Sequence, residues 1–207
     1  IRKLDGLSFK IPVGISIGRT NSLALQTQKQ SVDDIIAAFM LFEKSDVPIS
    51  YFELNISCPN LMGNITFYPK KNLEELLIET DKLHLKHPVF VKMPIDKSDR
   101  EILEMLDTIS KFSPKGVIFG NLQKDHKHPT LNQEEVAKFS AGHFSGKPTF
   151  DRSNELIKLA YKKYNKRFVI IGCGGVFNAQ DAWEKITSGA TLVQMITGLV
   201  FEGPQVV

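Results

Sequence analysis

The sequence predicts an α/β protein in which helices cover a parallel sheet, and two patterns support this fold class. Short apolar runs recur along the 207 residues, and longer stretches with apolar residues at helical spacing lie between them. Strands of a parallel sheet are buried on both faces, so their sequences are continuously apolar. The regular alternation of the two patterns is typical of repeated βαβ units.

Six segments have the composition of buried strands. They are short, rich in β-branched or aromatic residues, and bounded by Gly, Pro or polar residues. In chain order they are residues 12–18, 51–56, 88–94, 115–121, 168–172 and 191–197.

Five amphipathic helices are expected between these strands. Four of them should begin after an N-cap whose side-chain oxygen accepts hydrogen bonds from the first turn. These N-caps are Ser31, Asn72, Ser98 and Ser153. The fifth helix spans residues 179–188, and its Trp183 and Ile186 are expected to face inward. The polar segment 122–152 is expected to be a long functional loop without secondary structure of its own.

Six strands joined by five helical crossovers correspond to about strands 3 to 8 of a (β/α)8 TIM barrel. A complete barrel typically has ~250 residues, so the first two strands are expected to lie outside this chain. We expect residues 1–207 to form one partial barrel domain, inactive and aggregation-prone alone because its strand edges are open. A doubly wound sheet is the alternative, but no Gly-x-Gly-x-x-Gly turn follows the first strand.

Charge and cysteine content argue against several classes of protein. The 26 Lys and Arg and the 23 Asp and Glu are scattered, so the chain has no nucleic-acid-binding footprint. The two cysteines, Cys58 and Cys173, follow no signal peptide and favour a reducing compartment. No apolar run is long enough to span a bilayer.

Polar residues and glycines follow most of the predicted strands. The carboxyl ends of barrel strands meet on one face, where ligands bind. These strand-end residues are Ser16, Asn55, Cys58, Asn60, Lys92, Asn121, Gly174, Gly175 and Thr197. The backbone N–H groups of the Gly174–Gly175 pair precede a helix and suit a phosphate. Thr197 and Gly198 offer the same at the next strand, as in barrels that bind phosphate after strands seven and eight, although structural turns without a ligand are the alternative.

The side chains of this set suit proton transfer on a flat polar ligand. Their carboxamides both donate and accept, so they fit imide and carboxylate groups. Lys92 would supply a fixed positive charge; an exposed edge lysine is the alternative. Cys58 is the candidate general base, because a thiol with a pKa of about 8.5 can be tuned toward neutral pH. The alternative for Cys58 is a small buried apolar residue. The sequence has no cluster with metal-ligand spacing.

Five motifs in combination closely resemble the dihydroorotate dehydrogenase family, which consists of flavin-dependent (β/α)8 barrels. The resemblance covers the chain from about Val13 to its C-terminus. The motifs are ELNISCPN at residues 53–60, VKMP at 91–94, FSGKP at 144–148, IIGCGGV at 170–176 and GATLVQMITG at 189–198.

The resemblance implies FMN as cofactor and the oxidation of dihydroorotate to orotate in pyrimidine biosynthesis. Cys58 falls where the family has its base and would remove a ring proton while a hydride passes to FMN. Lys92 would stabilise the reduced flavin. The implied FMN contacts are Asn55, Lys92, Gly120, Gly146, Gly174, Gly175, Ile196 and Thr197. The implied substrate contacts are Asn55, Asn60 and Asn121.

The motifs point to two subclasses. Cys58 resembles the soluble class, whereas residues 144–148 and 191–204 resemble the quinone-using class. Ser16 also stands where the family has Asn, and Gly120 where Thr is usual. We favour the quinone class, with a location on the cytoplasmic side and peripheral membrane contact through an N-terminal segment outside this chain. The oligomeric state is left open.

Other functions stay open at this point. One is a soluble dihydroorotate dehydrogenase with fumarate or NAD as acceptor, and another is a flavin barrel like dihydropyrimidine dehydrogenase. A more distant one is a barrel without flavin in which Lys92 forms a Schiff base, and the last is a barrel without activity. Turnover of dihydroorotate against dihydrouracil, and the visible absorption of a flavin, would separate the active alternatives.

Overall fold

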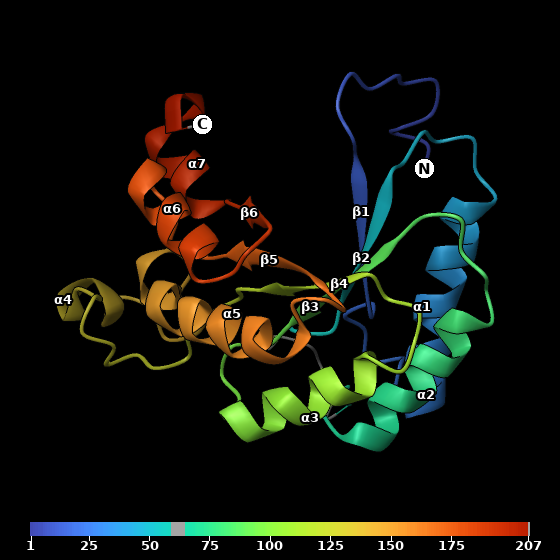
Figure 1. Cartoon of the computed structure of the whole chain (residues 1–207), viewed down its shortest axis with the longest axis horizontal. Helices are drawn as coiled ribbons and strands as arrows, with labels where there is room; N and C mark the ends of the chain where they lie inside the picture. The colour runs from blue at the N-terminus through green and yellow to red at the C-terminus, as the bar shows by residue number, and fades with distance from the viewer. Residues whose placement is uncertain (59–64, 207) are drawn as a thin grey trace. The chain divides into compact units, whose positions relative to one another are not determined.

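The computed structural model describes residues 1–58 and 65–206, which divide into two compact units. The first unit contains residues 1–56, 65–91 and 104–115. The second contains residues 57–58, 92–103 and 116–206. Figure 1 labels the helices and strands of both units.

Six strands follow one another in the sheet in chain order, β1-β2-β3-β4-β5-β6. The pairings β1–β2, β4–β5 and β5–β6 are parallel. A doubly wound sheet has a permuted strand order, so the sequential order excludes that alternative and confirms the predicted partial (β/α)8 barrel. The strands are β1 (Gly14–Gly18), β2 (Tyr51–Asn55), β3 (Val89–Met93), β4 (Gly116–Phe119), β5 (Val169–Cys173) and β6 (Leu192–Gln194).

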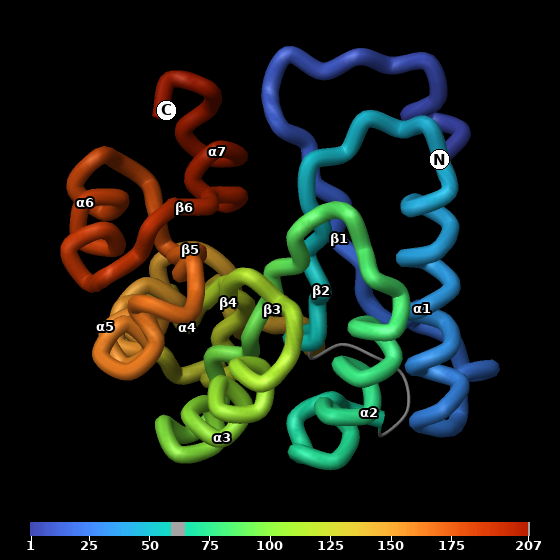
Figure 2. The backbone as a smooth tube through the Cα atoms, turned by 45° about the vertical axis from the view of Figure 1, so that its right-hand side comes forward, coloured from blue at the N-terminus to red at the C-terminus, as the bar shows by residue number. Residues whose placement is uncertain are grey.

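The core of the first unit lies between its strands and two neighbouring helices. Helices α1 (Gln28–Glu43) and α2 (Lys70–Asp81) lie side by side, as Figures 1 and 2 show. Phe39 of α1 packs edge-on against Phe52 of β2 with ring centroids 5.1 Å apart, and both side chains are fully buried. This apolar contact fixes α1 on the strand that leads toward Cys58.

The second unit contains β4, β5 and β6 with their helices. Helix α5 (Phe150–Tyr164) packs against β4, β5 and α6 (Ala179–Thr187). Helix α7 (Thr197–Glu202) follows β6 and leads into the short 3₁₀ turn η2 (Pro204–Val206). In the part of the chain described, no helix combines the length and the apolar character needed to cross a membrane.

Helix α3 (Asp99–Ile109) begins where the sequence predicts. Ser98 Oγ accepts from the Glu101 N–H at 3.3 Å, and Glu101 Oε2 accepts from the Ser98 N–H at 2.9 Å. Together these bonds form a capping box, in which the cap and the third helical residue each satisfy the other's free donor.

The other three predicted N-caps are wrong. Helix α1 begins earlier, because Thr27 and Gln30 form a capping box, and Ser31 is buried inside the helix. Helix α2 begins after Pro69, which sets the extended backbone before the first turn, and the Asn72 amide donates to Thr66 O at 2.9 Å. Helix α5 starts at Phe150, directly after the η1 turn (Lys147–Thr149), so that Ser153 lies within the helix and is buried.

The predicted orientation of α6 is also wrong. Trp183 is 61% exposed and Ile186 39% exposed, whereas Lys185 is fully buried. Positions 183 and 185 lie about 200° apart around a helix, so only one of them can face α5. The lysine takes that place because its ammonium finds hydrogen-bond acceptors on α5, as described below.

Two further segments differ from the prediction. The last strand is shorter than residues 191–197, because the chain turns at Ile196 (φ −132°, ψ −63°) and Thr197 begins α7. The polar segment 122–152 contains α4 (Gln133–Val136), the η1 turn and the first residues of α5. An antiparallel β-bridge pairs Gln123 with Phe144 and closes the part of the segment that lies between them.

Candidate functional site

A cavity of about 220 Å³ lies at the strand ends of the second unit. Its walls come from the end of β3, the segments after β4 and β5, the turn before η1, and the start of α7. Most of the predicted site residues meet here. They are Lys92, Gly120, Asn121, Gly146, Gly174, Gly175, Ile196 and Thr197.

The turn after β5 has a shape that only glycine can adopt. Gly174 and Gly175 have φ values of +98° and +76°, in the left-handed region. A Cβ on Gly174 would lie 2.4 Å from Thr149 Oγ1, and one on Gly175 would lie 2.5 Å from Phe150 Cβ. The backbone of this turn is therefore exposed to the cavity without side chains in the way.

Hydrogen bonds hold the turn before η1 from two sides. Gly146 has φ +80°, and its carbonyl accepts from Thr149 N at 2.9 Å and from Thr149 Oγ1 at 2.7 Å. On the other side, Thr197 Oγ1 donates to Ser145 Oγ at 2.9 Å. These bonds hold the segment with the FSGKP motif against the start of α7.

The end of β4 lies directly against the end of β5. Gly120 has φ +146°, and a Cβ there would lie 2.1 Å from the carbonyl oxygen of Cys173. Any larger residue would separate the two strand ends, which is a physical reason for glycine where the family commonly has threonine.

Asn121 links the cavity to the segment that carries the candidate base. Its side-chain Nδ2 donates to the carbonyl of Ser57, which is buried and immediately precedes Cys58. Cys58 is half-buried and forms no disulfide. Asn121 can therefore position both a ligand in the cavity and the Cys58 segment.

Lys92 is half-buried on β3, between the buried residues Val91 and Met93. Successive side chains of a strand point to opposite faces, so Lys92 points away from the core that holds its two neighbours. Lys92 is one of the residues that line the cavity, and it lies on an inner strand of the sheet, so it differs from the exposed edge lysine of the alternative.

Among the described residues, two predicted site residues, Asn55 and Cys58, are absent from the wall of this cavity. Asn55 ends β2 in the first unit, where it is half-buried. Asn60 lies outside the described residues. In the first unit, Ser16 Oγ donates to Oε1 of the buried Glu53 at 2.7 Å, so the proton of this hydroxyl is directed to a carboxylate. Within the described residues, no three His, Cys, Asp or Glu side chains gather to form a metal site.

Sequence reasoning missed part of the cavity wall. The additional lining residues are Leu122, Ser145, Cys173, Val176 and Met195. Each is a sequence neighbour of a predicted residue, so extending each strand-end motif by one or two positions would have found them.

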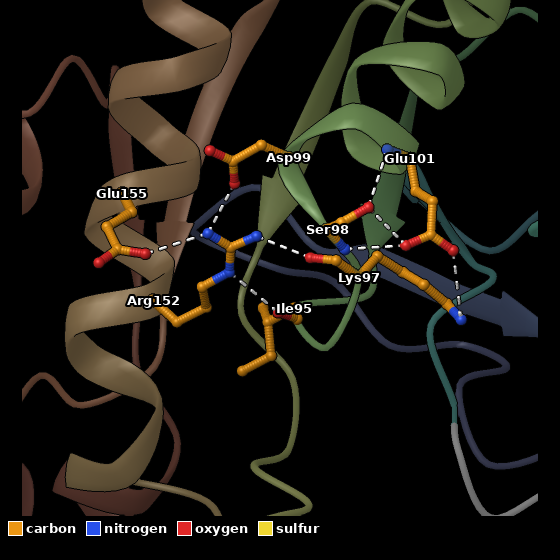
Figure 3. A network of polar contacts seen from close by, with 7 residues as sticks. All are labelled: Ile95, Lys97, Ser98, Asp99, Glu101, Arg152 and Glu155. Atoms are coloured by element: carbon orange, nitrogen blue, oxygen red, sulfur yellow. Dashed lines mark hydrogen bonds and ion pairs between the residues drawn. The ribbon is translucent and has the colours of Figure 1, made fainter.

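Arg152 holds the loop that follows Lys92 and β3. Its guanidinium donates to Ile95 O at 3.3 Å and Lys97 O at 2.7 Å, and also to the carboxylates of Asp99 and Glu155, as Figure 3 shows. Burial lowers the pKa of Arg152, but the two carboxylates more than offset this effect and the pKa is raised. The loop is thereby tied to α5.

Comparison with known proteins agrees with the motifs. Residues 9–207 match the family model described as dihydroorotate dehydrogenase. The chain is 32% identical over 212 residues to the dihydroorotate dehydrogenase (quinone) of Trichodesmium erythraeum, covering 97% of this chain and 53% of that protein. For the protein of the same description from Nostoc punctiforme, the identity is 33% over 202 residues, covering 95% and 52%. The chain spans about half the length of the curated relatives it matches.

Solved structures share the fold. The ligand-free DHODH of Eimeria tenella aligns with a TM-score of 0.80 and 22% identity, covering 98% of this chain and 58% of that one. The same protein in complex with ferulenol aligns with a TM-score of 0.78 and 22% identity, covering 97% and 56%. The likeness of these structures establishes the partial barrel fold independently of the strand order.

Proposed function

The chain belongs to the dihydroorotate dehydrogenase family, and from that premise we propose that the intact protein oxidises dihydroorotate to orotate with FMN. The observation that carries the proposal is the convergence of Lys92, Asn121 and the Gly174–Gly175 turn on one cavity. A cation, a carboxamide and bare backbone are the groups that a negatively charged, hydrogen-bonding cofactor requires.

The residues of the cavity fit FMN. Gly146, Gly174 and Gly175 form a cradle of bare backbone on the cavity wall, and only glycine fits there because a Cβ at each would meet a side-chain atom of a neighbouring element at 3.0 Å or less. Such a cradle suits a phosphate held by backbone N–H groups. We assign this phosphate to Gly146, Gly174, Gly175 and Thr197, and the flavin ring to the side where Lys92 lies.

Bound in this cavity, FMN would accept a hydride from the substrate. Cys58 would remove the proton from the neighbouring carbon as the general base. Lys92 would stabilise the negative charge that develops on the flavin, since a fixed cation in a site of low dielectric needs no reorganisation during the reaction. Asn121, with Asn55 and Asn60, would hold the carboxylate and imide groups of the substrate.

We further propose a quinone as electron acceptor and peripheral contact with a membrane surface. Support comes from the relatives, which are named as quinone-type enzymes, and from the FSGKP motif at residues 144–148. The place of the reaction in pyrimidine biosynthesis follows from the product, because orotate is a pyrimidine.

One experiment tests the reaction and the acceptor together. The purified intact protein is mixed with dihydroorotate, and the bleaching of the flavin absorption is followed; a soluble quinone, fumarate or NAD is then added. We expect bleaching by dihydroorotate but not by dihydrouracil, and rapid reoxidation by the quinone alone. Bleaching by dihydrouracil only would reject the substrate, and a colourless protein that binds no FMN would reject the flavin chemistry.

A further inference from the structure

Lys185 is a fully buried lysine outside the cavity wall. Its Nζ donates to Ser153 Oγ at 3.1 Å and to Asn154 Oδ1 at 3.0 Å, and lies 4.8 Å from the centre of the Phe150 ring. All three partners belong to the first turns of α5. Burying an ammonium group costs free energy even when it is hydrogen-bonded, and an apolar residue of similar volume would avoid that cost. Lys185 is therefore a candidate for a role other than stability.

Ser153 connects this ammonium to the strand ends under the cavity. Its Oγ lies 2.7 Å from Cys173 O and 3.0 Å from Phe119 O. An ammonium can only donate, so Ser153 accepts from Lys185 and directs its own single proton toward the two carbonyls. Phe119 and Cys173 are the last residues of β4 and β5, immediately before Gly120 and Gly174.

The aliphatic part of the Lys185 side chain packs directly on β5 at Gly172. A Cβ at Gly172 would lie 2.9 Å from Lys185 Cδ and 3.1 Å from Lys185 Cβ. Only a glycine at this position lets the stem lie directly on the strand. The stem therefore approaches Ser153 along a fixed path behind the Gly174–Gly175 turn.

We propose that Lys185 is a positioning residue of the cofactor site, which through Ser153 holds the ends of β4 and β5 so that the Gly174–Gly175 turn keeps the shape that binds the phosphate of FMN. This role rests on the proposed function, because it assigns the turn to FMN. Lys185 itself touches no ligand; it acts on the turn only through the Ser153 hydroxyl.

The buried charge of Lys185 lowers the free energy of unfolding. Burial is the main cause that lowers its pKa to about 8, against smaller opposing effects of Cys173, Asp181, Asp151 and Glu184. A lysine with a lowered pKa in the folded state destabilises the protein at neutral pH, because the unfolded chain holds the proton more tightly. Replacing it by methionine, which fills the same space, should therefore leave stability unchanged or raise it.

The proposed role predicts that Lys185→Met weakens FMN binding without lowering the free energy of unfolding, so the test measures both quantities. FMN is titrated into the apo form of the intact protein, and unfolding by urea is measured for wild type, Lys185→Met, Ser153→Ala and the double variant. Lys158→Met, which removes an exposed lysine from α5, is the matched control. We expect Lys185→Met to weaken FMN binding by about tenfold without loss of stability, and Lys158→Met to change neither.

The double variant tests whether the two residues act in sequence. If Lys185 acts through Ser153, the double variant binds FMN no more weakly than Ser153→Ala alone. FMN affinity of Lys185→Met within twofold of the wild type, or full additivity of the two substitutions, would overturn the role. Failure of the wild type to bind FMN would instead overturn the proposed function. Should Lys185→Met fail to fold, an unchanged FMN affinity in Ser153→Ala would still overturn the role.

Discussion

Arg152 Nη1 donates to Asp99 Oδ1 at 2.8 Å, and this bond joins residues 53 positions apart in the chain. The same guanidinium reaches Ile95 O and Lys97 O, so it binds both the loop after β3 and the first turn of α3. Lys92 lies three positions before Ile95 in the chain. The rigidity of the candidate site therefore depends in part on a residue that is absent from the cavity wall.

Arg152→Ala should lower the free energy of unfolding by about 2 kcal/mol, because partly buried carbonyls and two carboxylates lose a charged donor. Urea unfolding of the intact protein measures this loss. Lys162→Ala, which removes an exposed cation from the same helix, is the control and should change stability by less than about 0.5 kcal/mol.

Arg152→Lys separates charge from geometry. A lysine keeps the charge but cannot reach four acceptors with one ammonium, so we expect a loss close to that of Arg152→Ala. Full stability in Arg152→Lys would show that net charge, and not the fork of donors, holds the loop.

Gly174→Ala should abolish the phosphate cradle. The new Cβ would meet Thr149 Oγ1 at 2.4 Å, and the backbone would be held at φ +98°. We expect a loss of about 2–4 kcal/mol in stability and no measurable FMN binding. Isothermal titration of FMN into the apo variant, together with urea unfolding, measures both.

Gly142→Ala is a close control for backbone strain. Gly142 has φ +109°, but a Cβ there meets nothing within 4 Å. The substitution should cost only about 1 kcal/mol of strain and leave FMN binding intact. Equal losses of stability and of FMN binding in the two variants would mean that backbone strain alone, and not the clash with Thr149, explains Gly174→Ala.

The cavity was predictable from the sequence because strand ends converge in a parallel barrel. Lys92, Asn121 and the glycines after β5 could be placed by that rule alone, without any knowledge of side-chain contacts. Glycines are the most informative of these residues, because a backbone position with positive φ favours glycine and can therefore be suspected from the sequence.

The buried polar contacts could not be predicted in the same way. Lys185 looks like a surface charge of an amphipathic helix and Trp183 like a core residue, and the structure reverses them. The reversal depends on acceptors supplied by α5, which are distant in sequence from α6. The start of α1 was a different failure, because Thr27 and Gln30 have the spacing of a capping box and could have been recognised.

The capping box of α3 should make stability depend on pH. Bonds from Ser98 are the main cause that lowers the pKa of Glu101 below its usual 4.5. A lowered folded pKa means that the stabilisation is present above pH 4.5 and is lost as the pH falls through the folded value. Glu101→Gln keeps an acceptor but cannot titrate, so its stability deficit should shrink as the pH falls from about 6 to about 3.

Urea unfolding at several pH values follows the difference between wild type and Glu101→Gln. Glu134→Gln removes an exposed acid from the first turn of α4 and corrects for the general change in charge. A difference between wild type and Glu101→Gln that stays constant over this pH range would show that the carboxylate does not contribute through its ionised form.

Cys58 is the residue on which the proposed chemistry depends most. Cys58→Ala in the intact protein should keep FMN, because the glycine cradle is untouched, but should lower the rate of flavin reduction by dihydroorotate by about 100-fold or more. Stopped-flow measurement of flavin bleaching gives this rate directly, and the visible spectrum reports FMN content separately. An unchanged rate of flavin reduction in Cys58→Ala would exclude Cys58 as the base.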